Sequence, residues 1–261
     1  MISFFFINYI NKKLTKGLRN KGGRNILGRV CIYGQGGGTK KLYKYIDFYR
    51  RINKFGKILK IFRDLNRTSK IALVLYNNSL ISYILIQKKI NINSVIYSGT
   101  IYDNEIKEIK DGYSMPLKFM PLYSVLSNIE LKPFEGGKLA RSSNVSCLLI
   151  SKNNKNGILK FNSGWTLKLN IECIASMGVM SSISNKDLII GKAGKNRGLG
   201  WRPKVRGVAK NPCDHPHGGG NGKKSKPIVP TNAWHTVFKW KPTTNKKKDI
   251  LNRRLFKTIL K

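Results

Sequence analysis

The sequence predicts an all-β protein with two small barrels in its centre and a basic segment at each end. Short runs of β-branched and aromatic residues, separated by Gly, Asn and Lys, recur between residues 29 and 171. No long segment has the 3.6-residue apolar period of an amphipathic helix. The positive charge is concentrated outside the central part, whose composition is that of an ordinary folded body.

The first barrel is predicted from short strands between residues 24 and 102. Asn66 and the pair Asn77-Asn78 supply turns between them. So many strands in so short a segment are typical of a small barrel, because closure removes exposed sheet edges. The expected strands cover residues 29–33, 41–49, 57–62, 71–76, 82–86 and 94–102.

A second barrel is predicted over residues 103–187. Its hairpin turns fall at residues 153–154 and 162–164. The expected strands cover residues 125–131, 146–151, 157–161 and 166–171. The domain organisation that follows is an N-terminal extension 1–23, a barrel 24–102, a barrel 103–187 and a basic C-terminal extension 188–261. In this last segment Gly, Lys, Arg and Pro replace the apolar alternation, so we expect it to need a partner to become ordered.

The net charge of the chain is +38, from 50 Lys and Arg against 12 Asp and Glu. Residues 1–60 carry +14, residues 61–187 carry +7 and residues 188–261 carry +17. A compact protein with this charge repels itself, so it needs a polyanion as partner. Nucleic acid is the commonest polyanion, and a membrane surface is the alternative.

Targeting and redox features restrict the compartment. The apolar run at residues 2–10 is about half the ~20 residues that a membrane span requires. Basic residues follow this run rather than precede it, so we expect neither membrane insertion nor a secretory signal. The four cysteines are widely spaced and form no C-x-x-C, which predicts free thiols. Heavy use of Ile, Asn, Lys, Phe and Tyr indicates an A/T-rich genome, such as that of an organelle.

Three segments have the composition of RNA-binding elements. Residues 33–41, YGQGGGTKK, lack the spacing of a P-loop, so a nucleotide site is disfavoured. We expect a mobile hairpin loop that places its backbone N–H groups and lysines against RNA phosphates, with a plain flexible turn as the alternative. Aromatic and cationic side chains are interleaved in residues 43–51. They either stack on bases and bind phosphates, or form a strand whose aromatic side chains are buried and whose lysines are solvated. In this segment we expect Arg50 and Arg51 to face a phosphate. Residues 191–212 hold seven cations and no acid.

Residues 211–224, NPCDHPHGGGNGKK, gather a cysteine, an aspartate and two histidines within positions 213–217. A zinc site needs three or four ligands at compatible geometry, and Pro216 with the following glycines interrupts the spacing. A Cys-His nucleophilic pair would have to face across a pocket, which adjacent loop residues seldom do. A metallohydrolase built on this cluster is therefore the less favoured alternative to an RNA-contacting loop.

Three segments resemble, in order, the signature segments of the family of large-subunit ribosomal protein two. They are GRNILGRVCIYGQGGGTKKLYKYIDFYRR, LKPFEGGKLARSSN and GKAG…RPKVRGVAKNPCDHPHGGGNGK. The string V-R-G-x-A-x-N-P-x-D-H-P-H-G-G-G is the most specific part. The resemblance implies an OB-type barrel followed by an SH3-like barrel, and it places the family's Asp-His pair on Asp214 and His215. The chain departs from the family pattern in residues 1–21, at Trp201 and around Trp234.

The resemblance implies a structural constituent of the large ribosomal subunit, not an enzyme, that supports subunit assembly, subunit joining and the peptidyl transferase centre. Its implied partners are large-subunit rRNA, neighbouring ribosomal proteins and the small subunit across an intersubunit bridge. No cofactor is expected, apart from Mg²⁺ associated with rRNA. The A/T-rich composition favours a ribosome of the mitochondrial matrix, with a plastid or a bacterial cytoplasm as alternatives. A non-ribosomal nucleic-acid-binding module of two barrels is the alternative function.

The residues expected to contact rRNA are the cations of these segments and the polar and glycine residues of the 211–220 loop. They are Arg24, Arg29, Lys40, Lys41, Arg50, Arg51, Arg141, Lys192, Lys195, Arg197, Arg202, Lys204, Arg206, Asn211, Asp214, His215, His217, Gly218, Gly219, Gly220 and Lys223.

Overall fold

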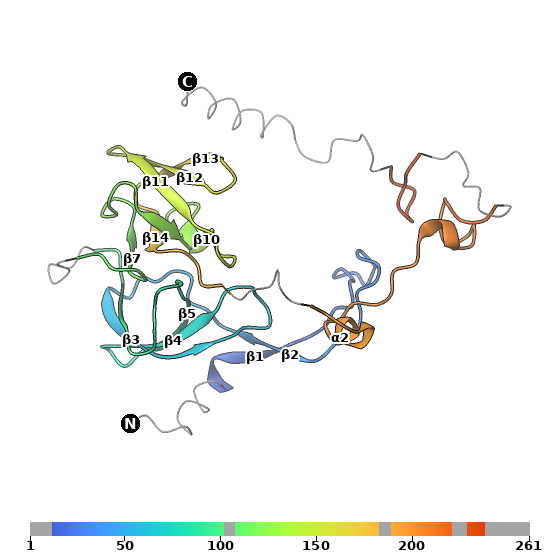
Figure 1. Cartoon of the computed structure of the whole chain (residues 1–261), viewed down its shortest axis with the longest axis horizontal. Helices are drawn as coiled ribbons and strands as arrows, with labels where there is room; N and C mark the ends of the chain where they lie inside the picture. Colours follow the sequence, from blue (N-terminus) through green and yellow to red (C-terminus); the bar gives the residue numbers. More distant parts are fainter. Residues whose placement is uncertain (1–11, 102–107, 183–188, 221–228, 238–261) are drawn as a thin grey trace. The chain divides into compact units, whose positions relative to one another are not determined.

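The computed structural model describes residues 12–101, 108–182, 189–220 and 229–237 (Figure 1). The chain divides into two compact units. Unit 1 comprises Met1–Arg19 and Lys40–Ile189, and unit 2 comprises Asn20–Thr39 and Ile190–Lys261. The linear boundaries expected from the sequence remain predictions, and the structure adds a discontinuous grouping in which residues 20–39 join the C-terminal segment.

The all-β class is confirmed, because strands form nearly all regular structure of the described residues. In that part of the chain no helix is long and apolar enough to cross a membrane. The strands are β1 Thr15–Leu18, β2 Lys41–Lys44, β3 Lys54–Phe62, β4 Ile71–Tyr76, β5 Ile81–Leu85, β6 Val95–Ser98, β7 Ser114–Pro116, β8 Val125–Ser127, β9 Ile129–Glu130, β10 Gly137–Leu139, β11 Cys147–Lys152, β12 Asn156–Phe161, β13 Thr166–Asn170 and β14 Ile174–Met177. The helical elements are α2 Ala193–Gly198 and the 3₁₀ turn η1 Gly207–Ala209.

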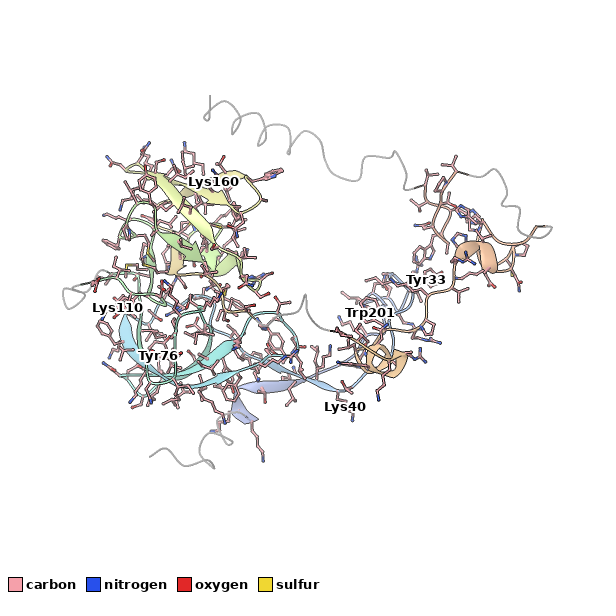
Figure 2. The ribbon with its side chains drawn as sticks, in the orientation of Figure 1. Tyr33, Lys40, Tyr76, Lys110, Lys160 and Trp201 are labelled. Carbon is pink, nitrogen blue, oxygen red and sulfur yellow. The ribbon has the colours of Figure 1, made fainter. Side chains whose placement is uncertain are left out.

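The first barrel of unit 1 is built on the antiparallel pairs β6-β3, β3-β4 and β4-β5. Strand β4 is a continuous apolar run, and alternate side chains of a strand point to opposite faces, so it contributes to two clusters. Ile71 and Leu73 enter one cluster, and Ala72 and Val74 enter the other. Figure 2 labels Tyr76, the last residue of β4, which is buried in this barrel.

Strand β6 joins the first barrel to the second. Its side chains alternate in direction, so Ile96 packs in the first core while its neighbour Tyr97 packs in the second. Ser98 then pairs with Ser114 of β7. Ten strands consequently form one continuous sheet through both barrels, in the order β13-β12-β11-β8-β14-β7-β6-β3-β4-β5. Strand β9 pairs with β10, and β1 with β2, in separate two-stranded sheets.

The strand predictions succeed where an apolar run is bounded by turn residues. Strand β4 coincides with the predicted 71–76, and β12 and β13 each differ by one residue from their predictions. The predicted strand 29–33 is wrong. There the backbone N–H groups of Cys31 and Ile32 both bond the carbonyl of Gly23, and pairing is limited to a single bridge. Residue 102 of the predicted strand 94–102 lies outside the described residues.

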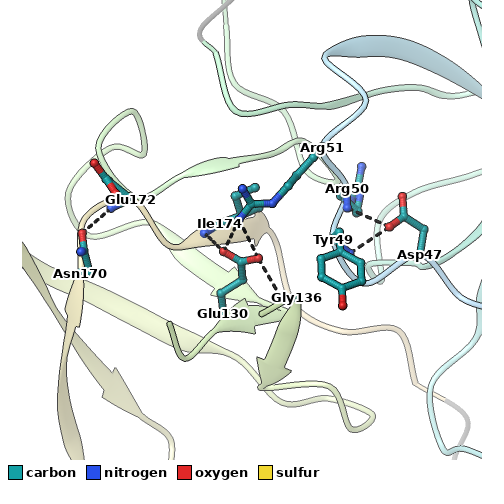
Figure 3. Close-up of polar contacts among 9 residues, drawn as sticks. All are labelled: Asp47, Tyr49, Arg50, Arg51, Glu130, Gly136, Asn170, Glu172 and Ile174. Atoms are coloured by element: carbon teal, nitrogen blue, oxygen red, sulfur yellow. Dashed lines mark hydrogen bonds and ion pairs between the residues drawn. The ribbon is translucent and has the colours of Figure 1, made fainter. Parts of the chain in front are cut away.

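Arg50 lies buried in unit 1, with 1% of its surface exposed. Its guanidinium donates hydrogen bonds to the hydroxyls of Ser98 and Ser176 and to the carbonyl of Tyr97. Its backbone has a φ of 51°, and its N–H is bonded to Asp47 Oδ1 at 3.0 Å (Figure 3). Burial lowers the pKa of Arg50. The expectation that Arg50 faces a phosphate is therefore wrong, because its partners are serines on β6 and β14.

Arg51 is also engaged inside unit 1. Its Nη2 donates to both carboxylate oxygens of Glu130, at 3.1 and 3.0 Å, and its guanidinium lies 3.9 Å from the ring centroid of Phe134. The backbone N–H groups of Gly136 and Ile174 donate to the same carboxylate at 3.0 Å each (Figure 3). Arg51 thus holds a buried carboxylate, and its expected contact with a phosphate stays a prediction.

The four cysteines are free thiols, as expected, and two of them are buried while the other two are exposed. Burial raises the pKa of Cys147 to about 12, and burial together with Glu130 raises that of Cys173 to about 11. Cys31 and Cys213 are exposed. Since the thiolate is the reactive form, a thiol-specific disulfide reagent at pH 8 should modify two thiols rapidly in the native protein and four in denaturant. Rapid native reaction of Cys147 or Cys173, measured by peptide mass spectrometry, would contradict this assignment.

Candidate nucleic-acid interface

Unit 2 contains a contact between two segments that are remote in sequence, the glycine-rich loop at residues 34–39 and residues 198–202. Both segments are irregular backbone with few apolar side chains, so hydrogen bonds rather than a core hold them together. The contacts are Gly36 N–H to Gly200 O at 3.1 Å, Thr39 N–H to Gly198 O at 3.0 Å, Arg202 N–H to Gly34 O at 2.7 Å and a bridge between Gln35 and Trp201.

Glycine is required on both sides of this contact. Gly38 has a φ of +88°, which side chains rarely adopt, and a Cβ there would lie 2.8 Å from the Cα of Gly200. The sequence predicts a hairpin loop that offers its N–H groups to phosphates. The structure corrects this in part, since the N–H groups of Gly36 and Thr39 bond residues 198–200 instead.

A cleft of about 1090 Å³ opens within unit 2. Cations from the 20–39 part of unit 2 and from residues 197–210 line it, and two aromatic rings lie beside them. The rings of Tyr33 and Trp234 stack with centroids 4.8 Å apart, and the ammonium of Lys210 lies 5.0 Å from the Tyr33 centroid. Figure 2 labels Tyr33, which directly precedes the glycine-rich loop, and Trp201, which lies in residues 198–202. The cationic lining residues are Arg24, Arg197, Arg202, Lys204 and Lys210.

The charge of unit 2 is almost unopposed. Its described residues contain ten Lys and Arg but a single carboxylate, that of Asp214. Cations that lack acidic neighbours repel each other and attract a polyanion, and Arg and Lys bind phosphate oxygens with charge-assisted hydrogen bonds. Stacked aromatic rings beside them suit unpaired bases. The cleft therefore has the chemistry of a site for RNA.

The loop at residues 210–219 closes on itself. Gly219 N–H bonds Lys210 O at 3.1 Å, and Gly218 N–H bonds His215 O at 2.9 Å. A Cβ on Gly218 would lie 2.4 Å from the carbonyl oxygen of Asn211. These glycines are thus required by the loop's own packing, which the sequence pattern had suggested only for close approach to RNA.

The two histidines of this loop have defined hydrogen-bonding roles. His215 Nδ1 accepts the N–H of His217 at 3.0 Å, so its proton resides on Nε2. His217 Nε2 accepts the N–H of Thr231 at 3.2 Å. Desolvation lowers the pKa of His215, with further lowering from His217 and Lys210, so its neutral form is favoured. Across residues 12–101, 108–182, 189–220 and 229–237, no three His, Cys, Asp or Glu side chains are arranged to hold a metal ion.

Most of the residues expected to contact rRNA belong to unit 2. Lys40, Lys41 and Arg141 belong to unit 1, where the Arg141 guanidinium lies 5.1 Å from the ring centroid of Phe48. Lys223 lies outside the described residues. Those in unit 2 are Arg24, Arg29, Lys192, Lys195, Arg197, Arg202, Lys204, Arg206, Asn211, Asp214, His215, His217, Gly218, Gly219 and Gly220.

Sequence reasoning missed several residues of unit 2. Tyr33 and Trp234 are 201 positions apart, so no local pattern could signal their stacking. Ile26 and Leu27 form an apolar loop tip, 96% and 78% exposed. Two apolar side chains in the middle of a basic segment are the one signal that could have drawn attention to this tip. Such a tip can pack against exposed base faces.

The two β-barrels, together with the cationic and aromatic cleft of the second unit, indicate an RNA-binding protein. Residues 11–98 match the family described as Ribosomal Proteins L2, RNA binding N-terminal domain, and residues 110–235 match Ribosomal Proteins L2, C-terminal domain. The chain belongs to the ribosomal protein L2 family. The expected OB-type and SH3-like barrels are confirmed with it.

Curated relatives agree with this membership over nearly the whole chain. The large ribosomal subunit protein uL2 of Rickettsia typhi is 43% identical over 251 residues, which cover 96% of this chain and 88% of the relative. The proteins of the same description from Rickettsia canadensis and Rickettsia prowazekii are each 42% identical over the same shares.

Proposed function

We propose that this chain is a structural constituent of the large ribosomal subunit that binds large-subunit rRNA. The observation that carries the proposal is the unit 2 cleft, where cations lie beside stacked aromatic rings and none of the described lining residues is acidic. Membership of the ribosomal protein L2 family supports it. Phosphates of the RNA neutralise the cations of unit 2, which have few acidic neighbours within the described chain.

A finer role concerns the loop that holds Asp214 and His215. We propose that this loop supports the peptidyl transferase centre and that the chain contributes to subunit assembly and to the joining of the small subunit. Its other partners are neighbouring ribosomal proteins. His215 acts by holding loop and RNA geometry, because its Nδ1 already accepts a backbone N–H. The chain carries out no catalysis in this role, and Mg²⁺ at the interface belongs to the rRNA.

The proposed compartment is the mitochondrial matrix, with a plastid or a bacterial cytoplasm as alternatives. The A/T-rich coding composition supports an organelle. Similarity to Rickettsia proteins supports a ribosome of the bacterial type. Fractionation of the source cells, with the chain followed by a specific antibody, distinguishes the three compartments.

The function is tested by co-sedimentation of the full chain with large ribosomal subunits at increasing salt. Arg202→Gln combined with Lys204→Gln should weaken binding to rRNA and lower the slope of log affinity against log salt by about 2, since each lost phosphate contact lowers it by about 1. The matched control is Lys160→Gln with Lys168→Gln, which removes the same charge from exposed positions on β12 and β13 of unit 1.

Loss of co-sedimentation at moderate salt in the wild type would favour the non-ribosomal alternative. Equal salt slopes for the two double variants would show that the unit 2 cleft is not the RNA site.

A further inference from the structure

We propose that a small hollow beside Tyr33 reads one unpaired guanine of the bound RNA. The inference rests on the proposed RNA-binding function and goes beyond it, because it assigns base recognition to a unit whose other charged groups suit phosphates. The hollow has a volume of about 370 Å³, within the range of small-ligand sites. It is lined by Tyr33, Val205, Ala209, Lys210, Asn211 and Asp214.

Asp214 is the group that points to a base. A carboxylate beside phosphates is repelled by them, and this is the single carboxylate in the described part of unit 2. Among the described residues no hydrogen-bond donor or cation pairs with its carboxylate, although its backbone N–H bonds Asn211 O at 3.0 Å. An ionised carboxylate only accepts hydrogen bonds, so its partner in RNA must be a donor.

Guanine matches the polar groups of the hollow best. Its Watson–Crick edge has two adjacent donors, the N1–H and the 2-amino group, which can bond both oxygens of one carboxylate. Adenine, cytosine and uracil each have only one donor group on that edge. The amide of Asn211 can donate to guanine O6, and the ring of Tyr33, which stacks on Trp234, lines the hollow beside the base. Lys210 adds a cation for the phosphate of the same nucleotide.

The hollow is held in shape before RNA binds. Asn211 O accepts the N–H groups of both Asp214 and His215, and Lys210 O accepts the N–H of Gly219. These bonds fix the turn that places Lys210, Asn211 and Asp214 around one space. A preformed site loses less free energy in ordering when it binds, so it can discriminate between bases.

The experiment measures the affinity of the full chain for fluorescent RNA heptamers, UUUUUUU and the same strand with a central guanine, adenine, cytosine or inosine. We expect the guanine heptamer to bind about tenfold more tightly than UUUUUUU. Inosine lacks the 2-amino group and should bind more weakly than guanine. The preference should be the same in EDTA and in Mg²⁺.

Asp214→Asn should abolish the guanine preference, while the affinity for UUUUUUU stays equal or rises because a negative charge is removed. Glu172→Gln is the matched control, since it removes one exposed carboxylate from unit 1, and it should keep the preference.

Equal wild-type affinity for all heptamers would overturn base recognition and leave phosphate binding intact. Persistence of the preference in Asp214→Asn, or equal binding of inosine and guanine, would overturn the two-donor contact. Loss of the preference in EDTA would show that Asp214 holds Mg²⁺ instead. Failure of the wild type to bind any RNA would contradict the proposed function itself.

Discussion

Replacing Glu130 with alanine is expected to destabilise unit 1 by about 3–5 kcal/mol, the usual cost of removing one partner of a buried ion pair. Glu130 has 0% of its surface exposed and accepts hydrogen bonds from Arg51, Gly136 and Ile174. Alanine leaves a guanidinium and two backbone N–H groups without an acceptor. Urea unfolding of the full chain, followed by circular dichroism, measures the change.

The control for this prediction is Glu172→Ala in the same barrel. Glu172 is exposed, and its described hydrogen bond uses its backbone N–H with Asn170 (Figure 3). Its replacement should change the free energy of unfolding by less than about 0.5 kcal/mol. If the two variants were equally stable, the bonds of Glu130 could not be what links β9 to β14 and to the turn before β10.

Gly38→Ala should separate the glycine-rich loop from residues 198–202, whereas Gly37→Ala should not. Both glycines have positive φ, +88° and +61°, so both substitutions carry a backbone cost of about 1–2 kcal/mol. Only at Gly38 does the new Cβ also meet backbone, 2.8 Å from the Cα of Gly200. No atom lies within 4 Å of it at Gly37. The steric contact is thus the difference between the variants.

Hydrogen exchange of the free protein measures this effect at Thr39, whose N–H bonds Gly198 O. Its protection should be lost in Gly38→Ala and largely kept in Gly37→Ala. Affinity for rRNA should fall in the same order, since the cleft takes residues from both segments. Equal protection in the two variants would mean that the close approach at Gly200 does not hold the loop.

Features that depend on residues close together in the sequence were predictable. Strand β4 was located because an apolar run lies between turn residues, and the cation-rich segments were recognised because their composition cannot form a core. Arg50 was misassigned, and the partner of Arg51 was not foreseen. Their neighbours in sequence are aromatic and cationic, but Ser176, which binds Arg50, and Glu130, which binds Arg51, are 126 and 79 positions away.

The all-β class, the need for a polyanionic partner and the family resemblance could all be predicted from the sequence alone. These depend on composition, on two-residue alternation and on a contiguous motif, all of which are local properties. Which cations are buried and which line the cleft depends on the tertiary structure. The tertiary structure also brings Tyr33 and Asp214 to the same hollow. Hydrogen-bonded contacts between remote segments depend on the fold of the chain, and no spacing along the sequence encodes them.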